Sequence, residues 1–253
     1  MESPVRRSDQ HEGQLVRLLL DRPRGNILDL EMVSAIRHEL SHIGTEAKLL
    51  VFEGAGETFS FGASVPEHFP NMIGTMLPNF HQLFWDLEAL AVPTAAVVRG
   101  HCLGGGFELA IWCGMVFCSP TARFGAPETK LGVFPPIAAI GLPWRVRGAR
   151  STQLILSGEL VNAEAAVEEG IADRCDDDPE AAMREWFSTA IAPKSTIALR
   201  TAWRASRRLL ADSLKNDLPA LETLYLNELM AHRDPLEGLT AFVERREPVW
   251  RNQ

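Results

Sequence analysis

The chain has 253 residues, of which 46% are hydrophobic and 23% are charged, and its formal net charge at pH 7 is −8. This is the composition of a globular protein, and the length suffices for a sizeable core without disulfides or a structural metal. The acidic balance argues against a nucleic-acid-binding surface, which would be basic.

Nothing in the sequence predicts export or membrane insertion. Residues 1–14 are polar and lack the apolar segment of a signal peptide, and no run of about 18 apolar residues occurs. The four cysteines form no C-x-x-C pair, so we expect buried, reduced thiols rather than a zinc ribbon or a redox pair. We therefore expect a cytoplasmic protein with no membrane partner and no nucleic-acid partner.

In chain order, strands and helices alternate up to about residue 190. Residues 1–11 are expected to be irregular, and Pro70 and Pro78 are expected to divide residues 66–90 into two helical pieces. Apolar runs and helical spacing predict strands at 15–20, 49–52, 93–98 and 115–118 and helices at 29–43, 105–114 and 162–170.

This alternation predicts an α/β core over residues 1–190 that contains the functional site. From 191 to 253 the pattern is helical, and one helix carries the apolar stripe Leu221, Leu224, Tyr225 and Leu229. We expect this tail to be a separate helical region.

Three motifs carry the chemistry: Phe61-Gly62-Ala63-Ser64, Gly104-Gly105-Gly106-Phe107-Glu108-Leu109 and Phe124-Gly125-Ala126-Pro127-Glu128. Three successive glycines let backbone N–H groups approach a ligand, and the following helix adds its positive N-terminal end. A site of this kind can stabilise a substrate oxygen on which negative charge develops during a reaction. The other interpretation is a tight turn needed only for packing. No Gly-Lys-Ser/Thr follows and the G-x-G-x-x-G spacing is absent, which argues against a phosphate loop and a dinucleotide site.

Two glutamates belong to these motifs. Glu108 falls in the first turns of the predicted helix, and Glu128 follows a proline after a strand. Each alone is compatible with an ordinary helix-end or surface acid. Together they are a carboxylate pair that can hold a water and move protons to and from a substrate.

In order and spacing, these motifs resemble the signature of the crotonase, or enoyl-CoA hydratase/isomerase, superfamily. The resemblance begins at residues 21–24, continues through 157–166 and ends at 237–248. It implies a spiral of ββα units and a C-terminal helical region, residues 191–253, that forms a homotrimer or homohexamer. It also implies an acyl-CoA thioester substrate, with no metal and no permanently bound cofactor.

The resemblance implies roles for individual residues. The N–H groups of Ala63 and Gly105 would form the oxyanion hole, and Glu108 and Glu128 fall on the two glutamates that hydratases use. The resemblance also implies a further set of residues that contact the bound acyl-CoA. Within this set, Arg24 either binds a phosphate or is an ordinary surface arginine in a turn. The members of this set are Arg24, Gly25, Asn26, Ser64, Val65, Pro66 and Phe134.

Some positions depart from the family pattern. Ser64 replaces an acid, Gly114 replaces an aspartate, and residues 134–139 replace a Pro-Gly-x-Gly-Gly stretch. Residues 26–29, 59–70 and 131–136 look most like the members that hydrate cyclohexa-1,5-diene-1-carbonyl-CoA to 6-hydroxycyclohex-1-ene-1-carbonyl-CoA. The alternatives are an ordinary enoyl-CoA hydratase or isomerase and a non-catalytic crotonase-like subunit.

A competing motif, His38-Glu39-Leu40-Ser41-His42, matches the H-E-x-x-H of zinc peptidases. Its two histidines lie on one face of the predicted helix, but Leu40 is expected to occupy the buried side. This favours a solvent-exposed polar face over a metal site. We treat a zinc peptidase as the remote alternative. His68 follows the Ala63 loop and is assigned no catalytic role.

Overall fold

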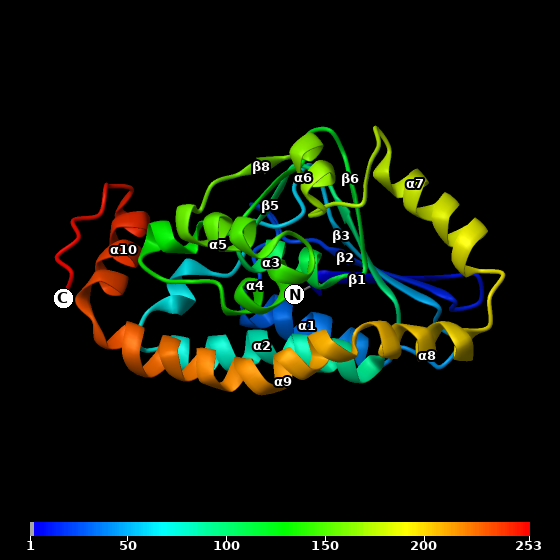
Figure 1. Ribbon diagram of the computed structural model, residues 1–253, viewed down its shortest axis with the longest axis horizontal. Coiled ribbons are helices and arrows are strands. Elements are labelled where there is room, and N and C mark those ends of the chain that lie inside the picture. Colours follow the sequence, from blue (N-terminus) through cyan, green and yellow to red (C-terminus); the bar gives the residue numbers. More distant parts are fainter. Residues whose placement is uncertain (1–2) are drawn as a thin grey trace.

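The main sheet of this computed structural model, which describes residues 3–253, has six strands in the order β1-β2-β3-β4-β6-β9 (Figure 1). Every neighbouring pair is parallel except β1 and β2. The strands are β1 (Val5–Gln10), β2 (Leu15–Leu20), β3 (Leu49–Gly54), β4 (Thr94–Val98), β6 (Met115–Cys118) and β9 (Arg174–Cys175).

A second, smaller sheet comprises β5 (His101–Leu103), β7 (Arg123–Gly125) and β8 (Val161–Asn162). Bridges from Ser60 to Cys102 and from Leu28 to Ala63 extend this layer. The chain therefore passes repeatedly from the main sheet to the second layer and then into a helix, as in β4–β5–α3. This is the predicted α/β spiral of ββα units.

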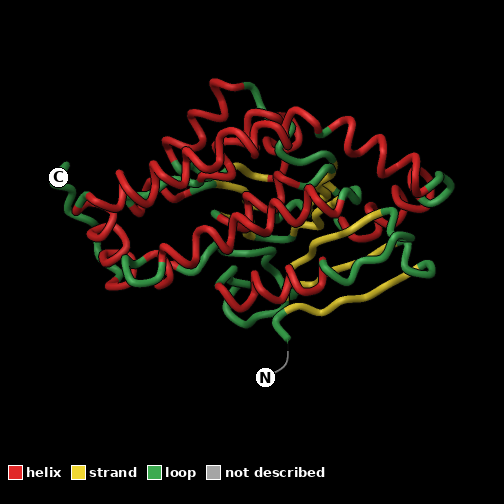
Figure 2. The backbone as a smooth tube through the Cα atoms, turned by 90° about the horizontal axis from the view of Figure 1, so that it is seen from below, coloured by secondary structure: helices red, strands yellow, loops and turns green. Residues whose placement is uncertain are grey.

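Residues 3–253 contain ten α-helices, and Figure 1 shows α1 and α2 together beside the main sheet. In Figure 2 most of the helices lie above the strands. Asn162 caps α6 as its sequence position predicts, because its side-chain oxygen accepts the Ala165 N–H at 2.9 Å. The helices are α1 (Leu30–Leu40), α2 (Ile73–Leu90), α3 (Gly105–Trp112), α4 (Pro136–Gly141), α5 (Gly148–Ser157), α6 (Ala163–Glu169), α7 (Pro179–Trp186), α8 (Thr196–Ser206), α9 (Arg208–Thr223) and α10 (Arg233–Glu244).

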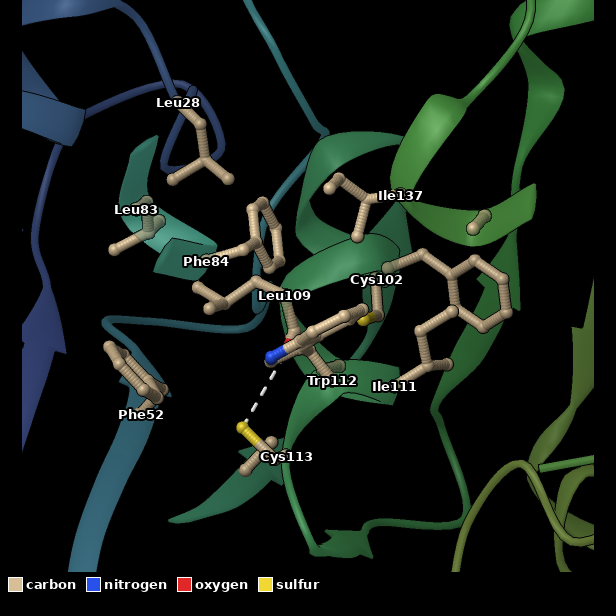
Figure 3. Close-up of a cluster of buried hydrophobic side chains, with 14 of the residues drawn as sticks. Leu28, Phe52, Leu83, Phe84, Cys102, Leu109, Ile111, Trp112, Cys113 and Ile137 are labelled. Atoms are coloured by element: carbon tan, nitrogen blue, oxygen red, sulfur yellow. Dashed lines mark hydrogen bonds between the residues drawn. The ribbon is translucent and has the colours of Figure 1, made fainter. Parts of the chain in front are cut away.

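The main core lies between the sheets and α1, α2 and α3. Phe84 of α2 meets Trp112 of α3 edge-on, with ring centroids 5.4 Å apart, and Ile137 of α4 packs into the same cluster (Figure 3). Helix α9 runs along α2 in Figure 1, and its buried leucines, Leu214 among them, belong to this cluster. The C-terminal helices therefore share a core with the sheets that carry the motifs.

Two expectations about local structure are wrong. Residues 5–10 form the edge strand β1, whose polar side chains face solvent, so a polar sequence concealed a strand that pairs fully with β2. Pro78 lies inside α2 instead of ending a helix. The buried neighbours Met76, Leu77 and Phe80 anchor this helix, and their packing outweighs the hydrogen bond that proline cannot donate.

The His38–His42 segment is a surface helix end. The two rings lie 4.5 Å apart, and His42 Nδ1 lies 2.8 Å from the His38 carbonyl oxygen. Across residues 3–253, no group of three or more potential ligands is placed to hold a metal ion. In that same part of the chain, none of the helices is long and apolar enough to cross a bilayer.

Candidate active site

The three sequence motifs meet at a small cavity with a free volume of about 20 Å³. Five of the predicted site residues line it: Ala63, Gly105, Glu108, Glu128 and Phe134. The other lining residues are His68, Met76, Leu77, Phe80, Pro135, Pro136 and Tyr225.

Two backbone N–H groups are available on one side of the cavity. A Cβ built on Gly105 would lie 3.3 Å from the Ala63 nitrogen, so the two peptide groups are neighbours. Within residues 3–253 neither N–H donates a hydrogen bond to another protein group. Gly62 makes this approach possible, because its φ is +100° and any side chain would meet the Leu103 oxygen at 2.8 Å. Paired free N–H groups of this kind suit a carbonyl oxygen that gains negative charge.

Glu108 enters the cavity from α3, a helix whose residues are all buried. Its Oε1 accepts the Ala138 N–H at 2.9 Å, at the start of α4, and the Ile137 N–H also contacts the carboxylate. Burial raises the pKa of Glu108 to about 7, although these two N–H groups favour the charged form. Glu108 is therefore poised to exchange a proton near neutral pH.

Glu128 faces Glu108 from the 3₁₀ turn Pro127–Leu131. Its Oε1 lies beside Gly104, where a Cβ would approach it to 3.0 Å, and its Oε2 is buried without a hydrogen-bond partner among the described residues. Burial first, and the charge of Glu108 second, raise the pKa of Glu128 well above its ordinary value. One carboxyl is thus held neutral beside another that ionises near pH 7, which is the arrangement of an acid–base pair.

A second, open groove of about 450 Å³ holds the predicted CoA-binding loop. Arg24, Gly25 and Phe61 line it, and Ala63 of the inner cavity follows Phe61 by two residues. Arg22, also in this wall, is paired with Asp29 and Glu31. Arg24 is exposed and makes no ion pair within residues 3–253, so its guanidinium is available to an anion.

Asn26 organises this loop from within. The side chain is buried, its amide nitrogen donates to three carbonyls of residues 55–59, and its oxygen accepts the Arg22 N–H at 3.0 Å. Both ends of the amide are engaged in this way, so the Asn26 side chain holds the loop that lines the groove in place.

The remaining predicted residues, Ser64, Val65 and Pro66, lie between Ala63 and His68 in the chain. Ser64 precedes the 3₁₀ turn Val65–His68, which includes Pro66. None of these three lines the cavity, but the Ser64 carbonyl accepts a hydrogen bond from His68 Nδ1 at 2.8 Å. Ser64 thus orients the histidine that does line it.

The sequence left two polar cavity residues without a role. The sequence places His68 after the Ala63 loop and indicates no catalytic role for it. Burial lowers the pKa of its ring, so it lines the cavity as a neutral group. Tyr225 appeared only as part of an apolar stripe. It comes from the C-terminal region, far from the other motifs in sequence, and only the packing of α9 under α2 brings it here.

Comparison with known proteins agrees with this geometry. Residues 10–253 match the enoyl-CoA hydratase/isomerase family. The chain is 41% identical over 253 residues to a cyclohexa-1,5-dienecarbonyl-CoA hydratase of Thauera aromatica, which covers 99% of this chain and 98% of that one. It is 29% identical to a carnitinyl-CoA dehydratase of Proteus mirabilis, covering 95% of this chain and 96% of that one.

Solved structures share the fold. An enoyl-CoA hydratase from Mycobacterium avium subsp. paratuberculosis K-10 superposes with a TM-score of 0.87 at 24% identity, with both chains covered completely. An enoyl-CoA hydratase/isomerase from Xanthobacter autotrophicus Py2 gives 0.84 at 25% identity, with 98% of each chain covered. Motifs, fold and full-length similarity agree that this chain belongs to the enoyl-CoA hydratase/isomerase family.

Proposed function

We propose that this protein is a hydratase that adds water to cyclohexa-1,5-diene-1-carbonyl-CoA and forms 6-hydroxycyclohex-1-ene-1-carbonyl-CoA. The reaction type rests on one observation above all, the two buried glutamates that share a cavity with two free N–H groups. The choice of substrate is supported by the 41% identity to the Thauera aromatica hydratase, against 29% to the carnitinyl-CoA dehydratase.

In this proposal the thioester carbonyl oxygen binds the N–H groups of Ala63 and Gly105. These donors draw electron density out of the conjugated ring, so that the ring carbon beside the acyl-bearing carbon accepts a nucleophile. Glu108, whose pKa is raised to about 7, takes a proton from water as the oxygen attacks that carbon. The electron pair of the double bond moves onto the thioester oxygen.

Glu128 completes the addition. With a pKa held well above its ordinary value, it enters the reaction protonated and delivers its proton to the far end of the diene. The electrons return from the thioester oxygen and form the remaining ring double bond beside the acyl-bearing carbon. One water is consumed and no redox partner is required, and proton transfer from Glu108 to Glu128 resets the pair.

The acyl ring is larger than the 20 Å³ cavity, so binding must displace side chains. The apolar wall from α2 contains Met76, whose unbranched side chain adapts readily. Phe134, Pro135 and Pro136 form the wall where the family has a glycine-rich stretch, and we propose that they shape the site for a flat ring. The CoA part would lie in the open groove, with Arg24 near a phosphate.

We further propose that residues 191–253 form a trimer contact in addition to closing the cavity. The number of large apolar side chains that this region exposes supports the proposal, since contact with a second copy would remove them from water. They include Ile197, Leu209, Leu224, Leu236, Phe242, Val243, Val249 and Trp250. Light scattering at micromolar concentration tests it, and a monomer would contradict it.

The reaction is tested with a panel of linear enoyl-CoA and cyclic dienoyl-CoA thioesters, followed by the ultraviolet absorbance of the conjugated thioester. We expect turnover of the cyclic diene to exceed that of any linear substrate. Glu128→Gln should lower turnover by at least about a hundredfold, because a general acid contributes roughly 10²–10⁴. Faster hydration of crotonyl-CoA than of the cyclic diene would indicate an ordinary enoyl-CoA hydratase.

A further inference from the structure

Tyr225 is a third polar group in the cavity, beyond the glutamate pair. It is the only tyrosine of the chain, and the residue is 1% exposed. Its ring packs against Phe134 with centroids 5.3 Å apart, which holds the phenol in the cavity wall. The residue lies in a π-helical turn, Leu224–Glu228, an irregularity that is frequent at functional sites.

The phenol oxygen is buried and has no hydrogen-bond partner among residues 3–253. A buried hydroxyl without a partner is unfavourable, and native proteins keep few of them. Glu128 Oε2 is a second such atom at the same cavity. Two unsatisfied polar atoms that line one small cavity point to a shared polar ligand.

The cavity fits that ligand. It admits an oxygen of water size, because the centre of a water-sized sphere has about 20 Å³ in which to lie. Burial, and then the charges of Glu128 and Glu108, raise the pKa of Tyr225, so the phenol stays neutral. A neutral phenol both donates and accepts hydrogen bonds, so it can bind a water and, after addition, an alcohol.

We propose that the Tyr225 hydroxyl binds the oxygen that is transferred. It accepts the second hydrogen of the attacking water while Glu108 takes the first, and this directs a lone pair of the water at the ring carbon. After addition the same phenol hydrogen-bonds the new hydroxyl of the product. This inference rests on the proposed hydration and adds a group that selects for hydroxylated ring ligands.

The test compares two ligands that differ only in that oxygen: the product 6-hydroxycyclohex-1-ene-1-carbonyl-CoA and cyclohex-1-ene-1-carbonyl-CoA, which lacks the hydroxyl. Tyr225→Phe should weaken binding of the hydroxylated ligand about tenfold and leave the other unchanged. Phe80→Leu is the matched control, because it trims an apolar wall residue and should affect both ligands equally. Circular dichroism confirms that each variant is folded.

A second readout uses the single tyrosine. With tyrosine ¹³C-labelled at the ring carbon that bears the hydroxyl, the one NMR signal should shift more with the hydroxylated ligand than with its deoxy analogue. If both ligands bind and neither the variant nor the signal distinguishes them, the role of Tyr225 is wrong while the hydratase proposal stands. If neither ring ligand binds, both proposals are wrong.

Discussion

Replacing Glu108 with glutamine should make the protein more stable at alkaline pH. The wild-type carboxyl has a pKa raised by burial to about 7, so the folded state keeps a proton that the unfolded chain releases near pH 4.5. Its contribution to the free energy of unfolding is therefore full below pH 4.5 and is lost as the pH rises toward 7. A shift from 4.5 to about 7 corresponds to about 3 kcal/mol.

The glutamine keeps the hydrogen bond from Ala138, because its amide oxygen also accepts, but it cannot ionise. Thermal unfolding of wild type and Glu108→Gln is compared at pH 5 and pH 8 at one protein concentration. For a chain of this size 1 kcal/mol shifts the melting temperature by about 2–4 °C. The melting temperature of Glu108→Gln minus that of wild type should therefore be about 6–12 °C larger at pH 8 than at pH 5.

Glu237 supplies a control, because its pKa is shifted in the opposite direction to that of Glu108. Hydrogen bonds from Arg246 lower the pKa of Glu237 to about 2, so this carboxyl is ionised in both folded and unfolded protein across pH 5–8. Glu237→Gln should therefore leave the pH slope of stability unchanged in that range. If Glu108→Gln and wild type lose stability in parallel between pH 5 and 8, the pKa of Glu108 is not raised in the folded protein.

Three further results are expected. The acid limb of kcat/KM should follow an apparent pKa of about 7 that belongs to the coupled glutamate pair, and a profile flat from pH 5 to 8 would contradict this assignment. Gly105→Pro removes one oxyanion N–H and, where circular dichroism shows a folded protein, should lower turnover roughly 10²–10³-fold; unchanged turnover would remove that donor from the mechanism. Gly114→Asp should lower the melting temperature, because a Cβ there would lie 2.4 Å from the Trp203 ring, and an unchanged melting temperature would show that the ring moves aside at little cost.

The predictable parts of the site are those whose chemistry is local in sequence. The glycine turn and Glu108 lie within five residues, and Glu128 follows a proline at the end of a strand, so backbone conformation and side-chain chemistry can be inferred together. The alternation of strands and helices up to residue 190 likewise follows from short apolar runs. These features led to the correct fold class.

The rest depends on contacts between segments distant in the chain. Tyr225 looks like a core residue by spacing, and only the packing of α9 under α2 brings its hydroxyl to the glutamates. Residues 134–139 stand out in the sequence as a departure from the family's glycine-rich stretch, but no sequence signal indicates that α4 donates the Ala138 N–H to Glu108. Gly114 stands where the resemblance implies an aspartate, and the Trp203 ring, distant in sequence, occupies the space that a Cβ there would take.

The central claim is most directly tested by hydrating the cyclic dienoyl-CoA in deuterium oxide and locating the label by NMR. We expect deuterium at the ring carbon at the far end of the diene and the hydroxyl group on the carbon beside the acyl-bearing carbon. Deuterium at the α-carbon of a linear enoyl-CoA, with no turnover of the cyclic diene, would contradict it.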